Sequence, residues 1–333
     1  MDNREIMVGI SLICYNHAPF LRKCLDSILM QKVNFRYQVV VGEDCSTDNS
    51  REILREYEEK YPDIFVMLYN EKNLGPSGNS LNVKRHLTGK YIVGGETDDF
   101  WTDENRLQKQ FDFLESHPEY VAVGSNFYSV DAEGKQGRME LFDYQVNKPY
   151  ELKDYLLYGY VIHGNTLMYR NVIPFQSEKY LKMRSVATTM GDIITRVLLY
   201  DKGRIFILPD IMHAHRSGAK TPSSFSCSYQ TRALEYTKMY CCIVDAIEEY
   251  CDGKYDLYEL KANRTAALME MKYLSKCKID SVEYKNYFQS LPKKICRKAK
   301  MRFIQKIARK IWRKILRKII KKYKTHEIEL EGE

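Results

Sequence analysis

The sequence predicts an α/β protein with a mostly parallel sheet and helices on both of its faces. Four apolar runs rich in β-branched residues alternate with amphipathic segments over the first hundred residues, and a polar loop follows each run. This alternation is typical of βαβ units. Apolar residues make up 44% of the chain, which includes 26 Tyr and 13 Phe, so a sizeable core can form.

Each expected element has its own signal. Residues 6–16, IMVGISLICYN, are continuously apolar, which predicts a strand buried on both faces. Residues 18–31 repeat apolar side chains at helical spacing. Further strands are expected at 37–43, 64–70 and 90–96, with helices at 46–61 and 73–87 between them. The first of these helices has Ser, Thr and Asp caps and stops before Pro62.

The charge is divided unevenly along the chain. Residues 293–324 contain 16 Lys and Arg and no acid, and the last nine residues contain four Glu, so residues 1–292 carry a net charge of −4 although the whole chain carries +8. We expect a mildly acidic globule with a basic tail. The nine Cys include no C-x-x-C pair, so we interpret them as reduced thiols of a cytosolic protein. We find no apolar signal segment and no run suited to span a bilayer.

Polar clusters follow all four expected strands. In parallel sheets, ligands bind beyond the carboxyl ends of the strands. The clusters are Tyr15 and Asn16, then Glu43, Asp44 and Ser46, then Asn70, Asn73 and Gly75, and finally Glu96, Asp98 and Asp99. Helix capping would explain any one of them. Four clusters on one rim predict a binding site.

The stretch GGETDDFW, residues 94–101, places three carboxylates at the end of an apolar strand. Neighbouring carboxylates raise one another's pKa unless a cation lies between them, and Mg²⁺ or Mn²⁺ prefers oxygen ligands. Glu96 and Asp98 alternate on an extended segment and face the same side, whereas Asp99 points elsewhere. The alternative is that residues 97–103 cap the helix expected at 104–118. Trp101 either stacks on a sugar or lies in the core.

Four blocks, in order, resemble the family 2 glycosyltransferases over about residues 6–218: ISLICYN with FLRKCLDSIL, VVVGEDCSTDNSREI, NLG with a later Asn, and KYIVGGETDDFWTDENRLQKQFDFLE. The resemblance implies a Rossmann-like GT-A fold and an inverting enzyme. It also implies that Asp44 hydrogen-bonds the base or ribose of a nucleotide sugar and that Tyr15 lines the nucleotide pocket. Glu96, Asp98 and Asp99 match the metal-binding D-x-D block.

This sequence departs from the family pattern at three positions. Glu96 and Glu43 stand where Asp is common, and Cys14 replaces a small polar residue. None of these changes removes a carboxylate, so we expect an active enzyme. The residues expected to bind the nucleotide sugar are Tyr15, Asn16, Glu43, Asp44, Asn79, Asp98 and Arg216. The residues expected to bind Mg²⁺ or Mn²⁺ are Glu96, Asp98 and Asp99.

An inverting transferase also needs a base for the acceptor hydroxyl. Asp192 begins an expected amphipathic helix where family members carry an acid, and the resemblance implies that it is the base. The alternative is an acid that the helix dipole favours. Asp210, in an expected loop, is the second candidate.

The segment HAHRSGAK, residues 213–220, is expected to close over the diphosphate. His213 and His215 would also suit a metal, but with no Cys or third His nearby in the sequence we disfavour a zinc site. His163 and Asn165 either contact the acceptor or are satisfied polar groups of the core.

We divide the chain into a glycosyltransferase domain at 1–225, a helical extension at 226–292, a basic amphipathic helix at 293–324 and an acidic tail at 325–333. The basic helix is expected to lie on an anionic membrane surface. Nucleic acid and a partner helix are the alternatives, but RNA-binding tails are poor in Ile and Trp. The apolar stripe comprises Ile304, Ile307, Ala308, Ile311, Trp312, Ile315, Leu316, Ile319 and Ile320.

The sequence therefore predicts a metal-assisted, inverting glycosyltransferase of the bacterial polysaccharide type. It would move a sugar from a nucleotide donor, most plausibly UDP-linked, onto a saccharide or lipid-linked saccharide in surface polysaccharide synthesis. We expect it to be cytoplasmic and peripheral on the inner face of the cell membrane. One alternative is a sugar nucleotidyltransferase, although CYNHAPF lacks the glycine-rich, basic loop of that class. The other is a membrane-associated scaffold that binds the donor without turnover.

Overall fold

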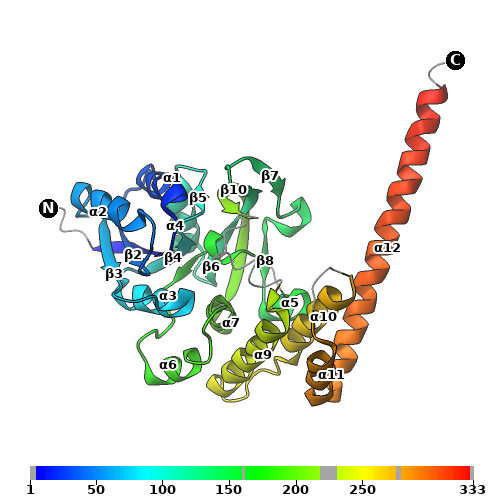
Figure 1. Cartoon of the computed structure of the whole chain (residues 1–333). Coiled ribbons are helices and arrows are strands. Elements are labelled where there is room, and N and C mark those ends of the chain that lie inside the picture. Colours follow the sequence, from blue (N-terminus) through cyan, green and yellow to red (C-terminus); the bar gives the residue numbers. More distant parts are fainter. Residues whose placement is uncertain (1–4, 160–161, 218–230, 275–278, 331–333) are drawn as a thin grey trace.

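The computed structural model describes residues 5–159, 162–217, 231–274 and 279–330, with side chains up to 312 (Figure 1). The strands are β1 Ile6–Cys14, β2 Arg36–Glu43, β3 Phe65–Tyr69, β4 Tyr91–Glu96, β5 Phe100–Trp101, β6 Tyr120–Val130, β7 Gln136–Met139, β8 Lys148–Tyr150, β9 Met168–Arg170 and β10 Arg204–Arg216. The helices are α1 Ala18–Leu29, α2 Ser50–Lys60, α3 Gly75–His86, α4 Arg106–Ser116, α5 Leu152–Tyr158, α6 Glu178–Arg184, α7 Asp192–Lys202, α9 Ala233–Tyr250, α10 Tyr258–Leu274, α11 Ser281–Ser290 and α12 Lys293–Leu330, with 3₁₀ turns η1 Asp143–Gln145 and η2 Gly164–Thr166.

The strands form one mixed sheet, whose main path runs β3-β2-β1-β4-β9-β6-β10-β5. Strands β1 to β4 pair in parallel, as do β6 and β10. Strand β9 lies between β4 and β6 and is antiparallel to both. The predicted α/β class with a mostly parallel sheet is confirmed, and the switch at β9 brings the end of β10 to the same rim as the ends of β1 and β4.

The core lies on both faces of the sheet, because successive strand residues point to opposite sides. In β4, Tyr91 and Val93 join the cluster that contains side chains of α1, α2 and α4. Ile92 between them joins the cluster that contains α7 and α9. Figure 1 shows these two groups of helices on opposite sides of the strands. Residues of β1 such as Ile10 are fully buried, as the continuous apolar run predicts.

Helices α9, α10 and α11 lie within the expected helical extension, whose boundary at 225/226 falls outside the described residues. Ile243 and Val244 of α9 belong to the same buried cluster as Val197 of α7. The extension is therefore packed directly on the sheet domain. A separate small cluster joins α10, α11 and the start of α12.

The first turns of α12 pack on the protein, although the whole basic helix was expected to lie on a membrane surface. Ile295 is 5% exposed and Ala299 is fully buried. Arg302, also buried, is paired with Glu259 of α10. The helix continues to Leu330, past the expected end at 324. A basic helix with an apolar stripe can pack on protein as readily as on lipid, and its first turns do so here.

The rest of α12 leaves the body of the molecule (Figure 1). Ile304, Ile311 and Trp312 are 63%, 53% and 62% exposed, as the stripe prediction requires. The stripe residues from Ile315 onward lie outside the described side chains. Within the described ranges, no helix combines the length and the hydrophobicity needed to cross a bilayer.

We predict that two truncations of α12 will differ in stability. Removal of residues 293–333 takes Ile295 and Ala299 out of the core, and loss of one buried aliphatic side chain alone costs about 2–5 kcal/mol. Removal of residues 313–333 leaves these contacts intact. Thermal unfolding should therefore show a lower midpoint for the first truncation and a wild-type midpoint for the second. Equal midpoints would mean that the start of α12 does not stabilise the domain.

Candidate active site

The loops after β1 and β2 are held to each other by side chains from both. The backbone NH of Asn16 donates to Ser46 Oγ at 3.0 Å, and Asn16 Oδ1 accepts from the NH of Thr47 at 2.8 Å. Asn16 has a positive φ of 55°, which turns the chain sharply after the strand. Asn16 thus shapes the rim through Oδ1, and its role as a nucleotide ligand remains a prediction. Tyr15 beside it is half-buried and remains a predicted ligand.

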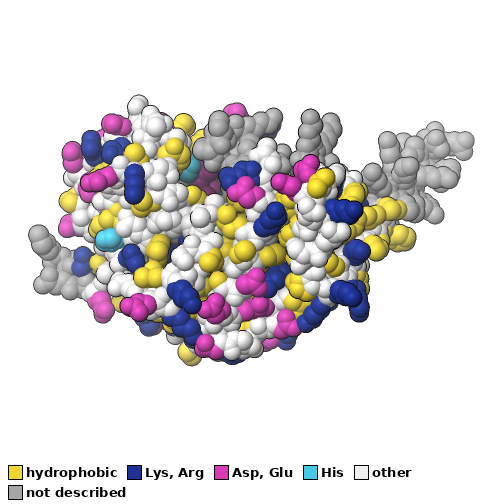
Figure 2. Space-filling view, turned by 60° about the horizontal axis from the view of Figure 1, so that its bottom comes forward, with side chains coloured by type: hydrophobic (Ala, Val, Ile, Leu, Met, Phe, Trp, Pro, Cys, Tyr) yellow, Lys and Arg dark blue, Asp and Glu magenta, His cyan; other side chains and the backbone are white. Residues whose placement is uncertain are grey.

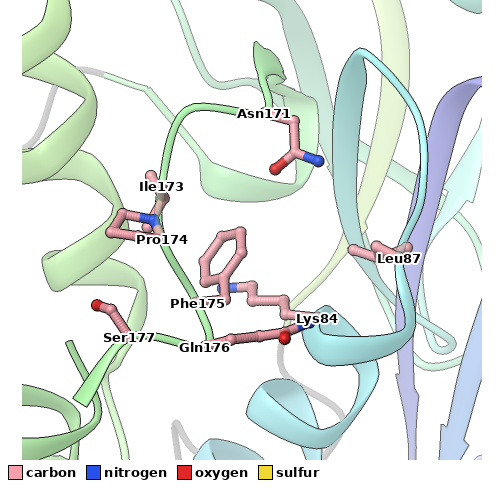
Figure 3. A pocket seen from close by; sticks show the side chains of 8 residues that line it. All are labelled: Lys84, Leu87, Asn171, Ile173, Pro174, Phe175, Gln176 and Ser177. Atoms are coloured by element: carbon pink, nitrogen blue, oxygen red, sulfur yellow. The ribbon is translucent and has the colours of Figure 1, made fainter.

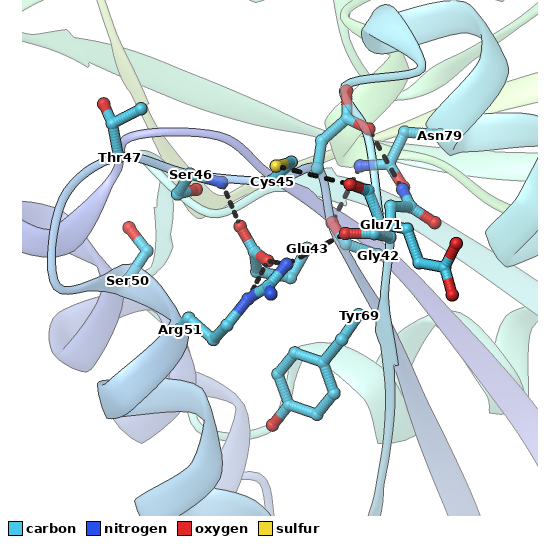
Figure 4. A network of polar contacts seen from close by, with 12 residues as sticks. Gly42, Glu43, Cys45, Ser46, Thr47, Ser50, Arg51, Tyr69, Glu71 and Asn79 are labelled. Carbon is cyan, nitrogen blue, oxygen red and sulfur yellow. Dashed lines mark hydrogen bonds and ion pairs between the residues drawn. The ribbon is translucent and has the colours of Figure 1, made fainter.

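Glu43 at the end of β2 is a structural acid (Figure 4). Its side chain is completely buried, Oε2 accepts from Arg51 Nε at 2.6 Å, and Oε1 accepts from the NH of Ser46 at 2.6 Å. Arg51 Nη2 also donates to the carbonyl of Asn70 at 2.9 Å. Both oxygens of Glu43 are thus used to join the ends of β2 and β3. This corrects the prediction that Glu43 binds the nucleotide.

Asp44, the next residue, is buried but differs in its contacts. Its Oδ1 accepts from Asn70 Nδ2 at 3.0 Å and from the NH of Leu74 at 2.8 Å. Both hydrogen bonds fall on one oxygen and orient the carboxylate at the sheet rim. Asn79, which we expected to contact the donor, is 1% exposed and donates to the carbonyl of Gly42 at 2.7 Å. Its amide supports β2, so that assignment is also corrected.

Glu96 and Asp98 follow β4. Glu96 is exposed, and crowding by protein atoms, together with the charges of Asp98 and Asp99, raises its pKa to about 8. Asp98 is half-buried, and burial followed by the charge of Asp99 raises its pKa. Its Oδ1 is buried without a hydrogen-bond partner among the described residues. Such an orphaned acceptor is expensive, and a cation or a donor group would satisfy it.

Asp99 occupies a different position, behind the rim. It is 3% exposed and accepts hydrogen bonds from His213 Nε2 at 3.0 Å, His215 Nδ1 at 3.2 Å, the NH of Arg216 at 2.7 Å and Asn165 Nδ2 at 2.9 Å. Burial alone would raise its pKa, but the two histidines outweigh it and hold the pKa well below its usual range. A carboxylate with four donors has little capacity left for a metal. Its assignment as a metal ligand is therefore corrected.

Three histidines meet beside Asp99: the ring nitrogens of His163, His213 and His215 lie within 4.8 Å of one another. The third histidine, His163, is distant in the sequence and is brought here as the N-cap residue of η2. His213 Nδ1 must accept from Arg106 Nη1 at 3.3 Å, since Arg can only donate, so the Nε2–H of His213 donates to Asp99. Both of its nitrogens are used. A three-histidine zinc centre is therefore disfavoured.

The remaining two histidines differ in charge. Burial holds the pKa of His163 well below its usual range, and its Nδ1 accepts from the NH of Asn165 at 3.3 Å. Its Nε2 therefore carries the proton. Asp99 raises the pKa of His215 despite burial, so Nδ1–H of His215 faces the carboxylate. The Nε2 atoms of these two histidines are the ring nitrogens left for a ligand. Asn165, by contrast, uses its amide on Asp99, so contact with an acceptor is not its role.

Arg216 fastens the end of β10. Its Nε donates to the carbonyl of Asp98 at 2.9 Å and its Nη1 to the carbonyls of Asp131 and Ala132 at 2.5 and 2.9 Å. The guanidinium also lies 4.1 Å from the ring centre of Phe20. Arg216 was expected to bind the donor diphosphate. Its buried guanidinium instead fixes the loop that carries Asp98.

Asp192 begins α7, as predicted, and its side chain is 54% exposed. It forms an ion pair with Arg196 one turn later. Asp210 lies in β10, where a loop was expected, and pairs with Lys109 at 2.7 Å. Trp101 is 5% exposed and lies in the core, which decides against sugar stacking.

Two site residues were missed by the sequence reasoning. His17 Nδ1 lies 2.9 Å from Thr97 Oγ1, and its charge affects the pKa of Asp98. Its position in the first polar loop was a usable signal. Arg184 is buried and donates to the carbonyls of Ser77 and Ala187 at 3.1 and 2.9 Å, which holds the loop before Asp192 against α3. No local pattern marks that role.

Residues 10–174 match the family model described as glycosyl transferase family 2. The chain belongs to that family. The matched range includes all four rim loops after β1 to β4, whereas α7 and β10 lie beyond it.

Relatives of known sequence match the same region. The uncharacterized protein Mb1547 of Mycobacterium bovis is 35% identical over 112 residues, which are 34% of this chain and 32% of that protein. The putative glycosyltransferase EpsE of Bacillus subtilis is 30% identical over 130 residues, 39% of this chain and 46% of that protein. The chain therefore spans about a third to a half of the length of these relatives.

Solved structures share the fold over a greater length. The structure of TarS residues 1–349 of S. aureus in complex with UDP-GlcNAc covers 87% of this chain and 83% of that chain, with a TM-score of 0.62 and 16% identity. The complex of the same protein with UDP has a TM-score of 0.59 at 15% identity and covers 87% and 82%. The GT-A fold of this family member thus includes much of the C-terminal part as well.

We predict that Glu43 supports the fold of this family 2 domain. Arg51→Ala should lower the free energy of unfolding by about 1.5–3 kcal/mol, the range for hydrogen bonds to a charged group, because a fully buried carboxylate loses its cation. Chemical denaturation measures the change. Arg55→Ala is the matched control, since Arg51 and Arg55 both lie 5.6 Å from the Tyr69 ring while the ion pair belongs to Arg51. Weaker UDP binding with unchanged stability would reverse the assignment of Glu43.

Proposed function

We propose that the protein is an inverting glycosyltransferase that transfers a sugar from a nucleotide-sugar donor, UDP-linked, onto a saccharide or lipid-linked saccharide. The observation that carries this proposal is Asp98, whose buried Oδ1 lacks a partner at the end of β4 in a domain of this family. At this rim the Asp98 carboxylate has an oxygen without a hydrogen bond, whereas the next residue, Asp99, is fully hydrogen-bonded. Asp98 is therefore suited to bind a charged ligand.

The donor nucleotide would lie against the loops after β1 and β2. Asp44 is held at the rim through Oδ1, which leaves Oδ2 as the oxygen for the ribose or base. Tyr15, half-buried in the neighbouring loop, would form one wall. TarS binds UDP and UDP-GlcNAc in crystals and has the same fold, which supports the choice of uridine.

A divalent cation, Mg²⁺ or Mn²⁺, fits the residues after β4. Glu96 and Asp98 offer oxygen ligands, and burial followed by the charges of neighbouring acids raises the pKa of both, so a cation between them would be favourable. When bound, the metal supplies charge neutralisation for the leaving diphosphate. Asp98 would hold it with Oδ1, and Glu96 would share it. His215 also acts on both acids, since its charge lowers their pKa values.

Asp192 would act as the general base. The acceptor hydroxyl gives its proton to the Asp192 carboxylate, its oxygen forms a bond to the anomeric carbon, and the bond from that carbon to the diphosphate breaks on the opposite face, which inverts the configuration. Asp192 pairs with Arg196, and its side chain is 54% exposed and so accessible to an acceptor. Asp210 is a weaker candidate, because its side chain is 36% exposed against 54% for Asp192 and both acids are paired with a cation.

The acceptor and the location follow from chain composition and relatives. A putative teichuronic acid biosynthesis glycosyltransferase of Bacillus subtilis, TuaG, is 28% identical over 114 residues, so an anionic or neutral surface polysaccharide is a reasonable product. The exposed stripe and 16 basic residues of α12 support attachment to the inner face of the cell membrane. A nucleotidyltransferase or a scaffold remains the alternative, separated by whether UDP is released from a UDP-sugar.

Asp98→Asn should abolish sugar transfer and metal-dependent release of UDP. Its thermal midpoint should stay at the wild-type value, because Oδ1 has no partner to lose. Product release is measured with a panel of UDP-sugars, with Mn²⁺ or with EDTA. Glu104→Gln is the matched control, an exposed acid in the same loop paired with Lys32 at 2.7 Å. Turnover by Asp98→Asn, or by the wild type in EDTA, would exclude the metal assignment. UDP binding without any release would favour the scaffold.

Asp192→Asn should leave UDP binding near the wild-type value and reduce transfer by about 10²–10⁴, the usual effect of losing a general base. Asn keeps the shape of the side chain but cannot accept the proton. Asp210→Asn serves as the comparison and should transfer normally, because Asp210 is engaged with Lys109. Calorimetry and single-turnover assays separate binding from chemistry. Normal transfer by Asp192→Asn would shift the role to Asp210 or His163.

A further inference from the structure

The ends of α10 and α11 and the first turns of α12 enclose a pocket of about 420 Å³. Its described lining includes three lysines and three aromatic side chains, Lys272, Lys285, Lys300, Tyr273, Tyr284 and Phe288. None of the described lining residues is acidic. The glycosyltransferase site lies at the sheet rim, in a different part of the molecule, so its mechanism does not use this pocket (Figure 1).

One of the three lysines is held by hydrogen bonds within the protein, and the other two are exposed to solvent. Lys272 Nζ donates to Ser281 Oγ at 3.0 Å and to the carbonyl of Ile279, and it lies 5.7 Å from the ring centre of Tyr284. Lys285 and Lys300 are exposed at the mouth of the pocket. Glu270, an acid of the same helix as Lys272, is already shared by two lysines of α12. The pocket thus presents positive charge that described acids do not cancel.

The floor and the surroundings are apolar. Tyr284 contacts Phe288 and Tyr273, with ring centres 4.8 and 5.9 Å apart. Tyr273 itself is 60% exposed. Around the mouth, Leu274, Val282, Met301 and Ile304 are 47%, 67%, 45% and 63% exposed. Figure 2 shows hydrophobic and basic side chains next to one another at the end of the molecule from which α12 departs. Apolar groups gathered in this way mark an interaction surface.

We propose that this pocket binds the phosphate head of a membrane lipid, with the surrounding apolar side chains in the acyl boundary. Lysine is a point-charge ligand for phosphate, and the apolar rim matches an anion that carries a hydrocarbon tail. A nucleic acid would supply the phosphate but would leave the aliphatic rim in water. The proposal deepens the membrane attachment of the proposed function, and its outcome is independent of nucleotide binding at Asp98.

The pocket at Lys84 on the other side of the molecule carries no comparable argument (Figure 3). Its volume is about 250 Å³, and Lys84 is covered by Phe175, whose ring centre lies 5.3 Å from Nζ. Burial and the charge of Arg184 lower the pKa of Lys84 to about 7. Its Nζ donates to Thr195 Oγ1 at 3.3 Å. This lysine is therefore directed into the protein, toward α7.

A pocket that binds phosphate should prefer one lipid headgroup over another, whereas a basic helix without a pocket should bind all anionic lipids of equal charge alike. Vesicles of phosphatidylcholine are prepared with phosphatidic acid or with phosphatidylglycerol, matched in zeta potential. Diffuse attraction depends on surface charge alone. The pocket favours phosphatidic acid, because its phosphate monoester is compact and accessible to two lysines at once. The full-length chain should bind the phosphatidic acid vesicles more tightly, by about fivefold for each lysine engaged.

The variant Lys285→Gln with Lys300→Gln should lose this preference while keeping its binding to phosphatidylglycerol. Lys314→Gln with Lys318→Gln on α12 removes the same charge and should weaken binding to both vesicles equally. Both lysines of the first pair are exposed, so the thermal midpoint should not change. The proposed pocket would be overturned if the wild type showed no preference between the two lipids, or if the first variant lost binding to both vesicles equally.

Soluble competitors identify the source of the phosphate. Dihexanoyl phosphatidic acid should displace the protein from the vesicles through the pocket, and inorganic phosphate at the same concentration should not. Equal displacement by both would make this a site for free phosphate and would refute the lipid. UDP-sugar turnover is measured in parallel. In the wild-type chain, absence of lipid selectivity with normal turnover rejects only this pocket, and absence of turnover with normal selectivity rejects only the proposed activity.

Discussion

The carboxylate of Asp99 holds together three segments that the chain brings from distant positions. Asn165 is 66 residues away, His213 is 114 and Arg216 is 117, and all three donate to it. A buried charge is tolerated only when it is paired and hydrogen-bonded, and removal of one partner of such a group is strongly destabilising. Asp99 thus clamps the end of β10 and η2 onto the loop after β4. The position of Asp98 depends on that clamp, because Arg216 also binds the carbonyl of Asp98.

A second pair of neighbouring acids follows β2, which lies two strands from β4 in the sheet. Glu43 ends β2 and Asp44 comes next, while Asp98 and Asp99 lie in and just after the turn that follows β4. In each pair one acid is saturated inside the protein, Glu43 by Arg51 and Asp99 by histidines, while the other is fixed at the rim with an oxygen to spare. The two inner acids, Glu43 and Asp99, build the frame of the site. The outer acids remain to meet a ligand.

The element order up to α4 was predictable from the sequence, because buried parallel strands are continuously apolar and their helices repeat every three to four residues. The position of the acids at the rim followed from the strand ends. Their separate roles did not, because the donors that saturate Asp99 come from β10 and η2, and no local pattern links them to β4. Asp210 was wrongly expected in a loop because it follows Pro209. It lies within β10, at an irregularity where the pairing register with β6 shifts between Leu208 and Ile211. Asn79, in the helix expected at 73–87, was expected to bind the donor, yet its amide is buried and donates to the carbonyl of Gly42.

The amphipathic pattern of α12 does not tell whether its apolar stripe packs on protein or on lipid. An apolar stripe with basic flanks satisfies the same free-energy requirement on a protein surface and on a lipid surface, since both remove apolar area from water. Here the first turns meet acids of α10, such as Glu259 and Glu270, and the later turns do not return to the body. The body carries a net charge of −4 and the helix carries 16 cations. This separation of charge gives the molecule a polarity, because an anionic surface attracts α12 and repels the body. It therefore favours attachment through α12, with the acidic body directed away from the anionic surface.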